Sequence, residues 1–337
     1  MIMRKVIVLA LGLYLLFYLL PLAVLGEDEL AQRLDSAPVE TLSPPRTEGG
    51  GSADGAHTVR VLMEDGAVEE LAMDEYLWRV VAAEMPASFE QEALCAQAAA
   101  ARTYTVRKQL VGTAAHPQAE VCTDIGCCQA YIAREEARTN WGENADAYEE
   151  KISRAVSETD GQVILYQGEP IQAVFFSAAA GETLAAVEVW GSEVPYLSGV
   201  TSPEGEEVPN YHTQVTVGAE EFRQTILGAY PQAELSGAPE EWLGETEYGS
   251  AGSVAAMTIG GAEIPGTKLR ELFSLRSTSF TLAAGAEELA FSVTGYGHGV
   301  GLSQYGANAM AAEGAGWREI LTWYYTGVTI GDCPVWN

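Results

Sequence analysis

The stretch from Glu75 to Lys108 constrains the fold most, because it encodes two helices separated by Pro86. Apolar side chains at helical spacing predict a first helix that ends at Glu84. The second helix, over about Phe89 to Lys108, carries alanine along one side. Because small side chains let other elements approach, we expect this alanine-rich helix to be closely packed.

Glu84 is the candidate catalytic residue of this stretch. It is the last charged group of an apolar helix and lies at a break beside the alanine-rich helix. A carboxylate in such a place is expected to be partly desolvated, which raises its pKa and suits it to general acid catalysis. The alternative is a helix-end residue that faces water, and the local pattern does not choose between the two.

Composition sets the class of protein. The chain has 337 residues, of which 47% are apolar and 19% charged, as in a globular protein. Its net charge of −29 argues against nucleic acid as a partner, since phosphates need a basic surface. The order of patterns predicts an α+β fold. We expect mixed helices and short antiparallel strands in one large extracytoplasmic domain, with one lobe or two.

The N-terminus indicates the location. Residues 1–5 are expected in the cytoplasm, because Arg4 and Lys5 precede residues 6–25, an uncharged run long enough to cross a bilayer. This predicts a single-pass cell-membrane protein whose body lies outside the cytoplasm. A cleaved signal peptide is the competing interpretation, although it usually has a shorter apolar core and a small-x-small cleavage site. Residues 26–57 are expected to form a flexible linker, and residues 58–337 the functional domain.

A second stretch concentrates metal-binding side chains. His116, Cys122, Cys127 and Cys128 fall within thirteen residues. Zinc binds thiolate and imidazole in tetrahedral geometry, but the usual paired C-x-x-C spacing is absent. A disulfide from Cys122 to either neighbouring cysteine is equally compatible with an extracytoplasmic protein.

Other stretches predict local structure. Thr58–Leu62 and Val68–Met73 are predicted to be paired strands, and Gln162–Tyr166 with Ile171–Phe176 a hairpin. Near the C-terminus, four glycines surround His298, and a helix is predicted to begin near Ser303. Such a loop can hold an anion or another polar ligand, although it lacks the lysine of a nucleotide-binding P-loop. His298 is expected to be a functional polar group or a capping residue.

These stretches together resemble the SpoIID family, the stage II sporulation protein D group, which includes peptidoglycan lytic transglycosylases and amidase enhancers. The resemblance is carried by VVAAEMPASFEQEALCAQAAAARTY, VCTDIGCCQAY, LRSTSF and GYGHGVGLSQYGANAMA. It covers roughly residues 59–330 and keeps the order of the motifs.

The resemblance implies that Glu84 cleaves the bond between N-acetylmuramic acid and N-acetylglucosamine without water, leaving a 1,6-anhydro end. The expected substrate is a glycan strand stripped of its stem peptides, so an amidase acting upstream is an implied partner. The resemblance also implies a structural zinc ion held by His116, Cys122 and Cys128. Three protein ligands leave a fourth position for water or another donor, and Cys127 is a candidate for it.

Further positions match the family, and one loop departs from it. The resemblance implies that substrate is bound by Arg102, Tyr104, His298, Gln304 and Tyr305. Family members usually have S-T-S-G-G where this chain has Ser177-Ala178-Ala179-Ala180-Gly181. Ser177 is therefore the one hydroxyl of that loop expected to bind sugar.

The altered loop at residues 177–181 is compatible with a second function. With fewer hydroxyls in the loop, the alternative is a non-catalytic amidase enhancer or cell-wall-binding module. A zinc peptidase is a third candidate, but the chain contains no H-E-x-x-H pair.

Overall fold

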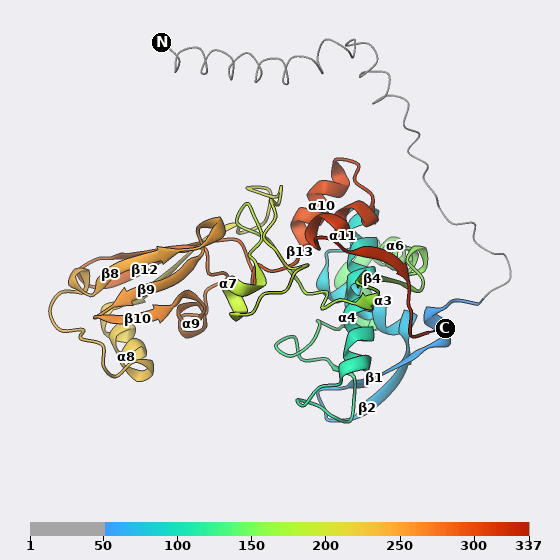
Figure 1. The fold of residues 1–337 in the computed structure, drawn as a ribbon, viewed down its shortest axis with the longest axis horizontal. Coiled ribbons are helices and arrows are strands. Elements are labelled where there is room, and N and C mark those ends of the chain that lie inside the picture. The colour runs from blue at the N-terminus through green and yellow to red at the C-terminus, as the bar shows by residue number, and fades with distance from the viewer. Residues whose placement is uncertain (1–50, 337) are drawn as a thin grey trace, which may run out of the picture. The chain divides into compact units, whose positions relative to one another are not determined.

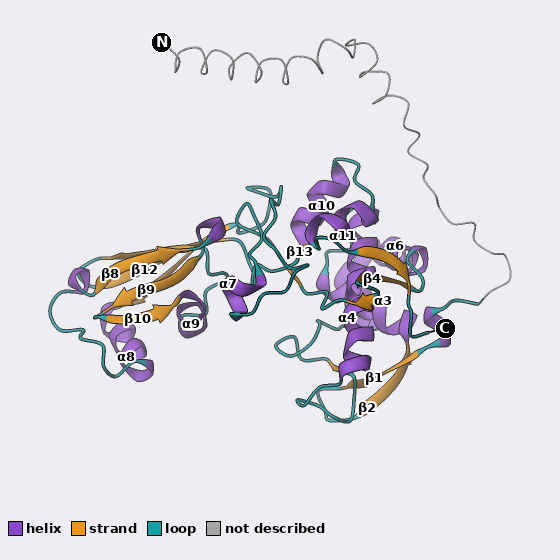
Figure 2. Ribbon diagram, in the orientation of Figure 1, coloured by secondary structure: helices purple, strands orange, loops and turns teal. Residues whose placement is uncertain are grey.

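The computed structural model describes residues 51–336, which form mixed helices and short, mostly antiparallel strands (Figure 2). This confirms the predicted α+β class. Within these residues, none of the helices combines the length and the hydropathy that crossing a bilayer requires. The expected span at residues 6–25 and most of the expected linker lie outside the described residues.

The alanine-rich helix α4 (Gln91–Val111) lies at the centre of the larger hydrophobic core (Figure 1). Its alanines from Ala93 to Ala101 are completely buried. Without bulky side chains in the way, four other helices and two strands contact it. These are α3 (Met73–Glu84), α6 (Ala145–Glu158), α10 (Gln304–Ala312), α11 (Trp317–Tyr324), β4 (Gln162–Tyr166) and β5 (Glu169–Pro170).

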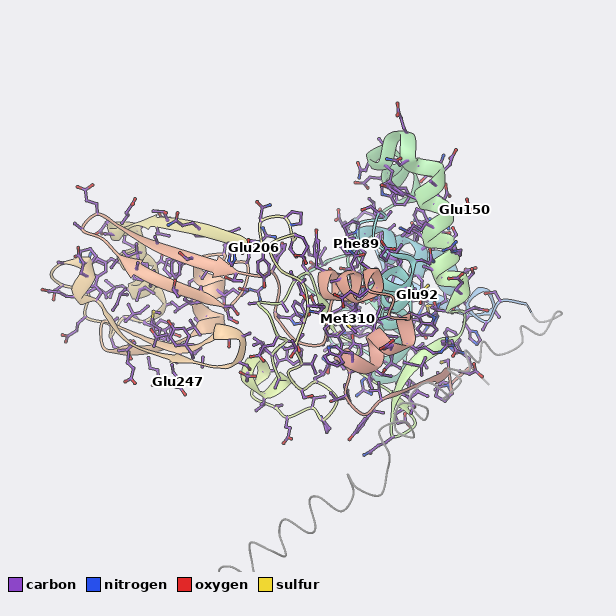
Figure 3. All side chains as sticks on the ribbon, turned by 90° about the horizontal axis from the view of Figure 1, so that it is seen from above. Phe89, Glu92, Glu150, Glu206, Glu247 and Met310 are labelled. Atoms are coloured by element: carbon purple, nitrogen blue, oxygen red, sulfur yellow. The ribbon has the colours of Figure 1, made fainter. Side chains whose placement is uncertain are left out.

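Helix α3 ends where the sequence predicts. Glu84 is its last residue, and Met85 is extended, with φ of −121° and ψ of 143°. Pro86 explains this, because its ring disfavours the helical conformation of the preceding residue. Side chains from the break pack on α10: Phe89 and Met310, both labelled in Figure 3, belong to the same core.

The predicted N-terminal strand pair is present. Strands β1 (Thr58–Leu62) and β2 (Val68–Ala72) are antiparallel, and β3 (Val121–Cys122) runs parallel beside β1. The residues just before β1, assigned to the linker from sequence, are part of the folded body. They form the short helix η1 (Asp54–Ala56), in which the side chain of Asp54 is 1% exposed.

The predicted hairpin after residue 162 is only partly correct. Strand β4 pairs with β5 (Glu169–Pro170) and with β14 (Thr329–Asp332) from the C-terminus. Strand β6 (Phe175–Phe176) instead runs parallel to β13 (Leu302–Ser303), which leads into α10. This pairing joins the segment before Ser177 to the glycine-rich loop.

Residues 212–294 form the strands and helices drawn in yellow to orange in Figure 1, and they enclose a second hydrophobic core. Its central side chains include Phe222, Phe273 and Phe291, whose rings pack on one another. It contains two three-stranded antiparallel sheets with the orders β11-β12-β7 and β10-β9-β8. The strands are β7 (His212–Gly218), β8 (Leu243–Tyr248), β9 (Val254–Ile259), β10 (Ala262–Pro265), β11 (Phe280–Ala284) and β12 (Glu288–Thr294). The helices are α8 (Ala219–Ala229), η3 (Pro239–Glu241), η4 (Ser250–Gly252) and α9 (Gly266–Leu272).

The remaining helices are short. They are α5 (Arg134–Trp141) and η2 (Gly142–Asn144), which precede α6, and α7 (Ala186–Trp190), which follows the Ser177 loop.

Candidate active site and metal site

The carboxylate of Glu84 is held by two hydrogen-bond donors from distant parts of the chain. The backbone N–H of Ala130 donates to Oε1 over 2.7 Å, and the side-chain amide of Gln304 donates to Oε2 over 3.1 Å. Gln304 is itself oriented by Gln97, whose Oε1 accepts a second bond of 3.4 Å from the same nitrogen. The break after α3, the loop before α5 and the start of α10 therefore meet at one carboxyl group.

The surroundings of Glu84 favour its protonated form. Burial raises the pKa of this carboxyl group above its ordinary value, although the hydrogen bonds from Ala130 and Gln304 act in the opposite direction. Glu84 retains some exposure to solvent. A carboxyl group that is protonated more readily than usual, and still reachable, can donate a proton to a bound ligand.

The acidic residues at the start of α3 are not placed to assist Glu84. Glu75 binds the guanidinium groups of Arg79 and Arg134, each over 2.7 Å. Among the described residues, no other carboxylate is hydrogen-bonded to Glu84. The site therefore has one carboxyl group with raised pKa rather than a bonded pair.

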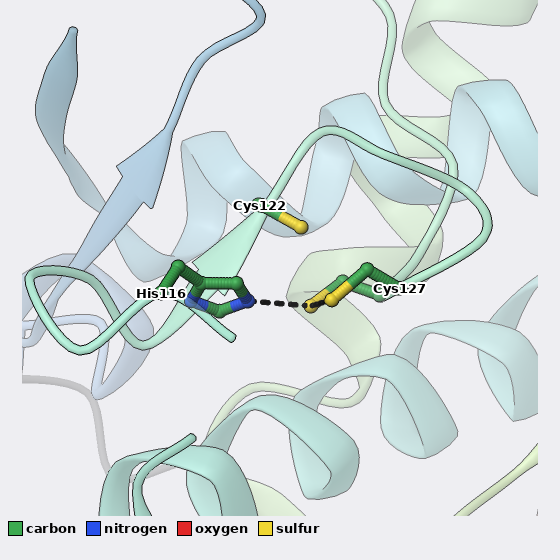
Figure 4. Close-up of side chains that lie close together, drawn as sticks. His116, Cys122 and Cys127 are labelled. Atoms are coloured by element: carbon green, nitrogen blue, oxygen red, sulfur yellow. Dashed lines mark hydrogen bonds between the residues drawn. The ribbon is translucent and has the colours of Figure 1, made fainter. Parts of the chain in front are cut away.

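The predicted metal ligands converge in the loop between α4 and α5. The ligand atoms of His116, Cys122, Cys127 and Cys128 all lie within 4.8 Å of one another. Figure 4 shows the side chains of His116, Cys122 and Cys127 gathered at this point. His116 Nε2 lies 3.3 Å from the sulfur of Cys128. Ligand atoms of a tetrahedral zinc site, with bonds of about 2.0–2.3 Å, are separated by roughly 3.3–3.8 Å. The cluster could thus hold a metal ion after a small contraction.

The orientation of His116 also fits a metal ligand. Its Nδ1 lies 3.0 Å from the carbonyl oxygen of Ala119 and must carry the proton to donate to it. The lone pair of Nε2 is then left facing the sulfur atoms, as in histidines that bind metals. Burial tends to raise the pKa of the Cys128 thiol, but hydrogen bonds from the Cys122 backbone and from His116 bring it below its usual value.

The structure has no disulfide between Cys122 and either Cys127 or Cys128, the alternative that the sequence left open. All five cysteines are free thiols in the described residues.

A pocket of about 640 Å³ adjoins this cluster. Cys127, Cys128 and Gln129 form part of its wall, and Gln129 immediately precedes the Ala130 amide that holds Glu84. Two predicted substrate residues also line it. The hydroxyl of Tyr104 lies 3.5 Å from the Cys127 carbonyl oxygen, and His298 forms part of the wall. Its lining comprises Tyr104, Arg107, Lys108, Val111, Ile125, Gly126, Cys127, Cys128, Gln129, Gln172, Val174, Phe175, Trp190 and His298.

His298 is held as a neutral side chain. Its Nδ1 accepts from the N–H of Val300 over 3.1 Å, so the proton is on Nε2, which donates to the Phe175 carbonyl oxygen over 3.1 Å. Burial lowers its pKa to about 4, with a contribution from nearby Arg270. The glycines around it allow this fit: at Gly297, with φ of +121°, a Cβ would lie 2.6 Å from Phe176 Cβ.

Three other predicted substrate residues lie around Glu84 or on the neighbouring loop. Gln304 binds the carboxylate directly. The ring of Tyr305 packs edge-on against Phe89, with centroids 4.9 Å apart. The carbonyl oxygen of Ser177 accepts the backbone N–H of Tyr305 over 3.0 Å, which links the Ser177 loop to the start of α10.

Arg102 is placed differently from the sequence-based expectation of a substrate-binding residue. Its side chain is completely buried and forms a bidentate ion pair with Asp54, with distances of 2.7 Å and 2.6 Å. Thr159 and backbone carbonyl groups take its remaining donors. In this structure, Arg102 holds η1 against the core and presents no surface to a ligand.

Glu204 was not predicted from the sequence. It is 4% exposed, and its Oε1 accepts the backbone N–H of Ala179 over 2.6 Å and the hydroxyl of Ser303. Its Oε2 accepts from Ser202, whose hydroxyl also bonds to Tyr324. This carboxylate thereby ties the Ser177–Gly181 loop to the N-terminus of α10, which carries Gln304. Nothing in its sequence context, Pro203-Glu204-Gly205-Glu206, indicates that this side chain is buried.

The fold and the site define an α+β protein with one half-buried carboxyl group beside a pocket and a histidine–cysteine cluster. A sequence profile described as "SpoIID: Stage II sporulation protein" matches residues 64–166. The chain is 38% identical to the stage II sporulation protein D of Bacillus subtilis (strain 168) over 267 residues, 79% of this chain and 76% of the relative. It is 36% identical to the protein of the same name from Bacillus amyloliquefaciens over 268 residues, with the same coverage.

The chain therefore belongs to the stage II sporulation protein D family, which confirms the resemblance. An amidase enhancer of Bacillus subtilis is more distant, at 28% identity over 74% of this chain and 39% of the relative.

Proposed function

We propose that the protein is a lytic transglycosylase that cleaves N-acetylmuramic acid–N-acetylglucosamine bonds in peptidoglycan strands stripped of their peptides. Family membership supports a role in sporulation, and the name of the amidase enhancer relative supports one at the cell wall. The observation that carries the specific reaction is the environment of Glu84, a lone carboxyl group whose pKa is raised by burial.

In the proposed reaction, Glu84 acts first as acid and then as base. Its carboxyl proton moves to the glycosidic oxygen as the bond from C1 of N-acetylmuramic acid breaks. The resulting carboxylate then takes the proton of the C6 hydroxyl of the same sugar, whose oxygen forms a bond to C1. A retaining hydrolase would need a second carboxylate about 5–5.5 Å away as nucleophile. An attacking group supplied by the substrate removes that need.

The donors around Glu84 suit this cycle. The Ala130 N–H and the Gln304 amide both bond to the carboxylate, so they stabilise the charge that appears when the proton leaves. They also fix the orientation of the carboxyl group for the second proton transfer.

We propose that the histidine–cysteine cluster binds zinc in a structural role. His116, Cys122 and Cys128 would hold the ion, with Cys127 as the fourth ligand. When bound, zinc would cross-link the loop from residue 116 to 128 and so stabilise the wall of the pocket next to Glu84.

The proposed setting is the outer face of the cell membrane. Residues 6–25 would anchor the protein with its N-terminus in the cytoplasm, and the linker would let the body reach the wall. An amidase acting first would be the functional partner, since it produces stripped strands.

A Glu84→Gln variant tests the proposed role of Glu84. Stripped glycan strands are incubated with the wild-type chain, with Glu84→Gln and with Glu90→Gln. The last variant is a control, because Glu90 is an exposed glutamate in the segment between α3 and α4. Wild type and Glu90→Gln are expected to release 1,6-anhydro ends. Glu84→Gln is expected to lose them while keeping its metal content and an unfolding midpoint no lower than that of wild type, and their persistence would refute the proposal.

The amidase enhancer remains the second candidate, because of the similarity to the enhancer and the three alanines in the Ser177–Gly181 loop. Two assays distinguish these functions. In one, stripped glycan is mixed with the protein alone; in the other, intact peptidoglycan is mixed with the protein and an amidase. Anhydro ends with the protein alone indicate the transglycosylase. Faster peptide release without anhydro ends indicates the enhancer.

A further inference from the structure

The pocket beside the histidine–cysteine cluster differs in charge from the rest of the chain. The sequence contains 47 acidic and 18 basic residues. The pocket lining nevertheless includes two cations, Arg107 and Lys108, and no aspartate or glutamate. A concave site with one sign of charge in an acidic protein favours a ligand of the opposite sign.

Both cations are available to a ligand. Neither makes an ion pair with a carboxylate of the described residues, whereas Arg102 on the same helix is fully engaged by Asp54. Arg107 donates one hydrogen bond, of 2.9 Å, to the Pro170 carbonyl oxygen, which leaves four of its five N–H donors. Lys108 Nζ lies 5.3 Å from the centroid of the Tyr104 ring, with which it makes a cation–π contact.

The rest of the lining suits a sugar derivative. Tyr104, Phe175 and Trp190 provide aromatic surface, and Trp190 is 43% exposed. Gln172 is exposed and provides a side-chain amide that can bond to hydroxyl or acetamido groups, whereas the Gln129 amide is buried and donates to Tyr76 and Thr105. A volume of about 640 Å³ is in the range of small-molecule sites. The pocket thus combines apolar walls, an exposed amide and two cations.

The pocket also adjoins the candidate catalytic group. Gln129 is in its wall, and the next residue, Ala130, donates to Glu84. Neighbouring Cα atoms are only about 3.8 Å apart. The wall of the pocket is therefore one residue along the chain from the donor that holds Glu84.

We propose that this pocket recognises the free lactyl carboxylate of an N-acetylmuramic acid residue, with Arg107 and Lys108 as its cationic partners. This rests on the proposed function for the choice of substrate. While a stem peptide is attached, the lactyl carbonyl is an uncharged amide and the peptide fills the space beside it. Removal of the peptide creates the anion that the two cations attract, so the pocket selects stripped strands.

Binding measured without cleavage tests this proposal. Defined stripped-glycan fragments are titrated by calorimetry into the full chain carrying Glu84→Gln, alone and combined with Arg107→Gln, Lys108→Gln or both. The control adds Arg223→Gln, which removes the same charge from an exposed ion pair on α8. Each pocket substitution is expected to weaken binding about tenfold, as for a charged hydrogen bond, and the pair more strongly. The control should bind as the parent does.

A second ligand series isolates the carboxylate. The same fragments with lactyl carboxylates converted to methylamides, and N-acetylglucosamine oligomers of equal length, are expected to bind the parent weakly. Their affinity should not change with Arg107→Gln or Lys108→Gln. The proposal is overturned if charged and neutral fragments bind the parent equally, or if the double pocket variant binds charged fragments as tightly as the parent.

The binding experiment and the cleavage experiment can fail separately. If charged fragments bind as expected but wild type releases no anhydro ends, the recognition of stripped strands stands and the transglycosylase does not. If anhydro ends form but the pocket substitutions leave binding unchanged, the transglycosylase stands and the proposed recognition fails.

Discussion

At the scale of single residues, Glu84 shows how the surroundings of one group determine what it can do. Helix α3 places it at a break, and Pro86 enforces that break. The position is visible in the sequence, but its partners are not. Ala130 and Gln304 come from segments 46 and 220 residues away, and no local pattern relates them to Glu84.

The raised pKa of Glu84 makes a prediction about stability. A carboxyl group with a higher pKa in the folded than in the unfolded state lowers stability as pH rises from its ordinary value of 4.5 through its folded pKa. Above that range, the buried charge carries its full penalty. Glu84→Gln has no such charge, so it should raise the thermal midpoint relative to wild type at pH 7.

The comparison is made by calorimetry at pH 4 and pH 7, with Glu90→Gln as control. The difference between Glu84→Gln and wild type should shrink at pH 4, where both side chains are neutral. A difference that is equal at both pH values, or larger at pH 4, would contradict the raised pKa.

At the scale of structural elements, the sequence was most informative where the signal was local. The break at Pro86, the alanine-rich helix and a helix that begins near Ser303 were predicted from local sequence, and all are present. The pairing of β6 with β13 was missed because it joins strands more than a hundred residues apart. The burial of Arg102 was missed because its partner, Asp54, lies in a stretch whose composition predicted a flexible linker.

The Asp54–Arg102 pair should stabilise the body without contributing to binding. Asp54→Asn leaves a buried guanidinium without its counter-charge, which costs about 3–5 kcal/mol in such cases. Replacing both partners, as Asp54→Leu with Arg102→Met, should recover much of this loss. Urea unfolding measures both effects.

Substrate affinity then distinguishes a structural Arg102 from the substrate-binding residue expected from sequence. The folded double variant should bind glycan fragments like wild type. A large loss of affinity with unfolding free energy retained would show that Arg102 acts on the substrate after all.

The histidine–cysteine cluster makes a further prediction at this scale. Chelation, or Cys128→Ser, is expected to remove one metal ion per chain and to lower the thermal midpoint. Cys95→Ser is a matched control, since that thiol is buried in α4 outside the cluster. Metal analysis with calorimetry measures both effects. Full metal content in Cys128→Ser, or none in wild type, would exclude the proposed site.

At the scale of the whole molecule, the proposed location of the protein rests on residues 6–25, which lie outside the described body. The run at residues 6–25 is apolar enough to predict a span. The full chain should remain in the membrane pellet after alkaline carbonate extraction, and a chain lacking residues 1–25 should be released. Release of the full chain, or its appearance as a shortened soluble form, would favour a cleaved signal peptide.

The central claim is that Glu84 cleaves glycan without using water. Wild type and Glu84→Gln are therefore incubated with stripped glycan in water enriched in a heavy oxygen isotope, and the new ends are examined by mass spectrometry. If Glu84 acts without water, wild type produces 1,6-anhydro ends free of the isotope and Glu84→Gln produces none. Labelled reducing ends from wild type, or unlabelled anhydro ends from Glu84→Gln, would contradict it.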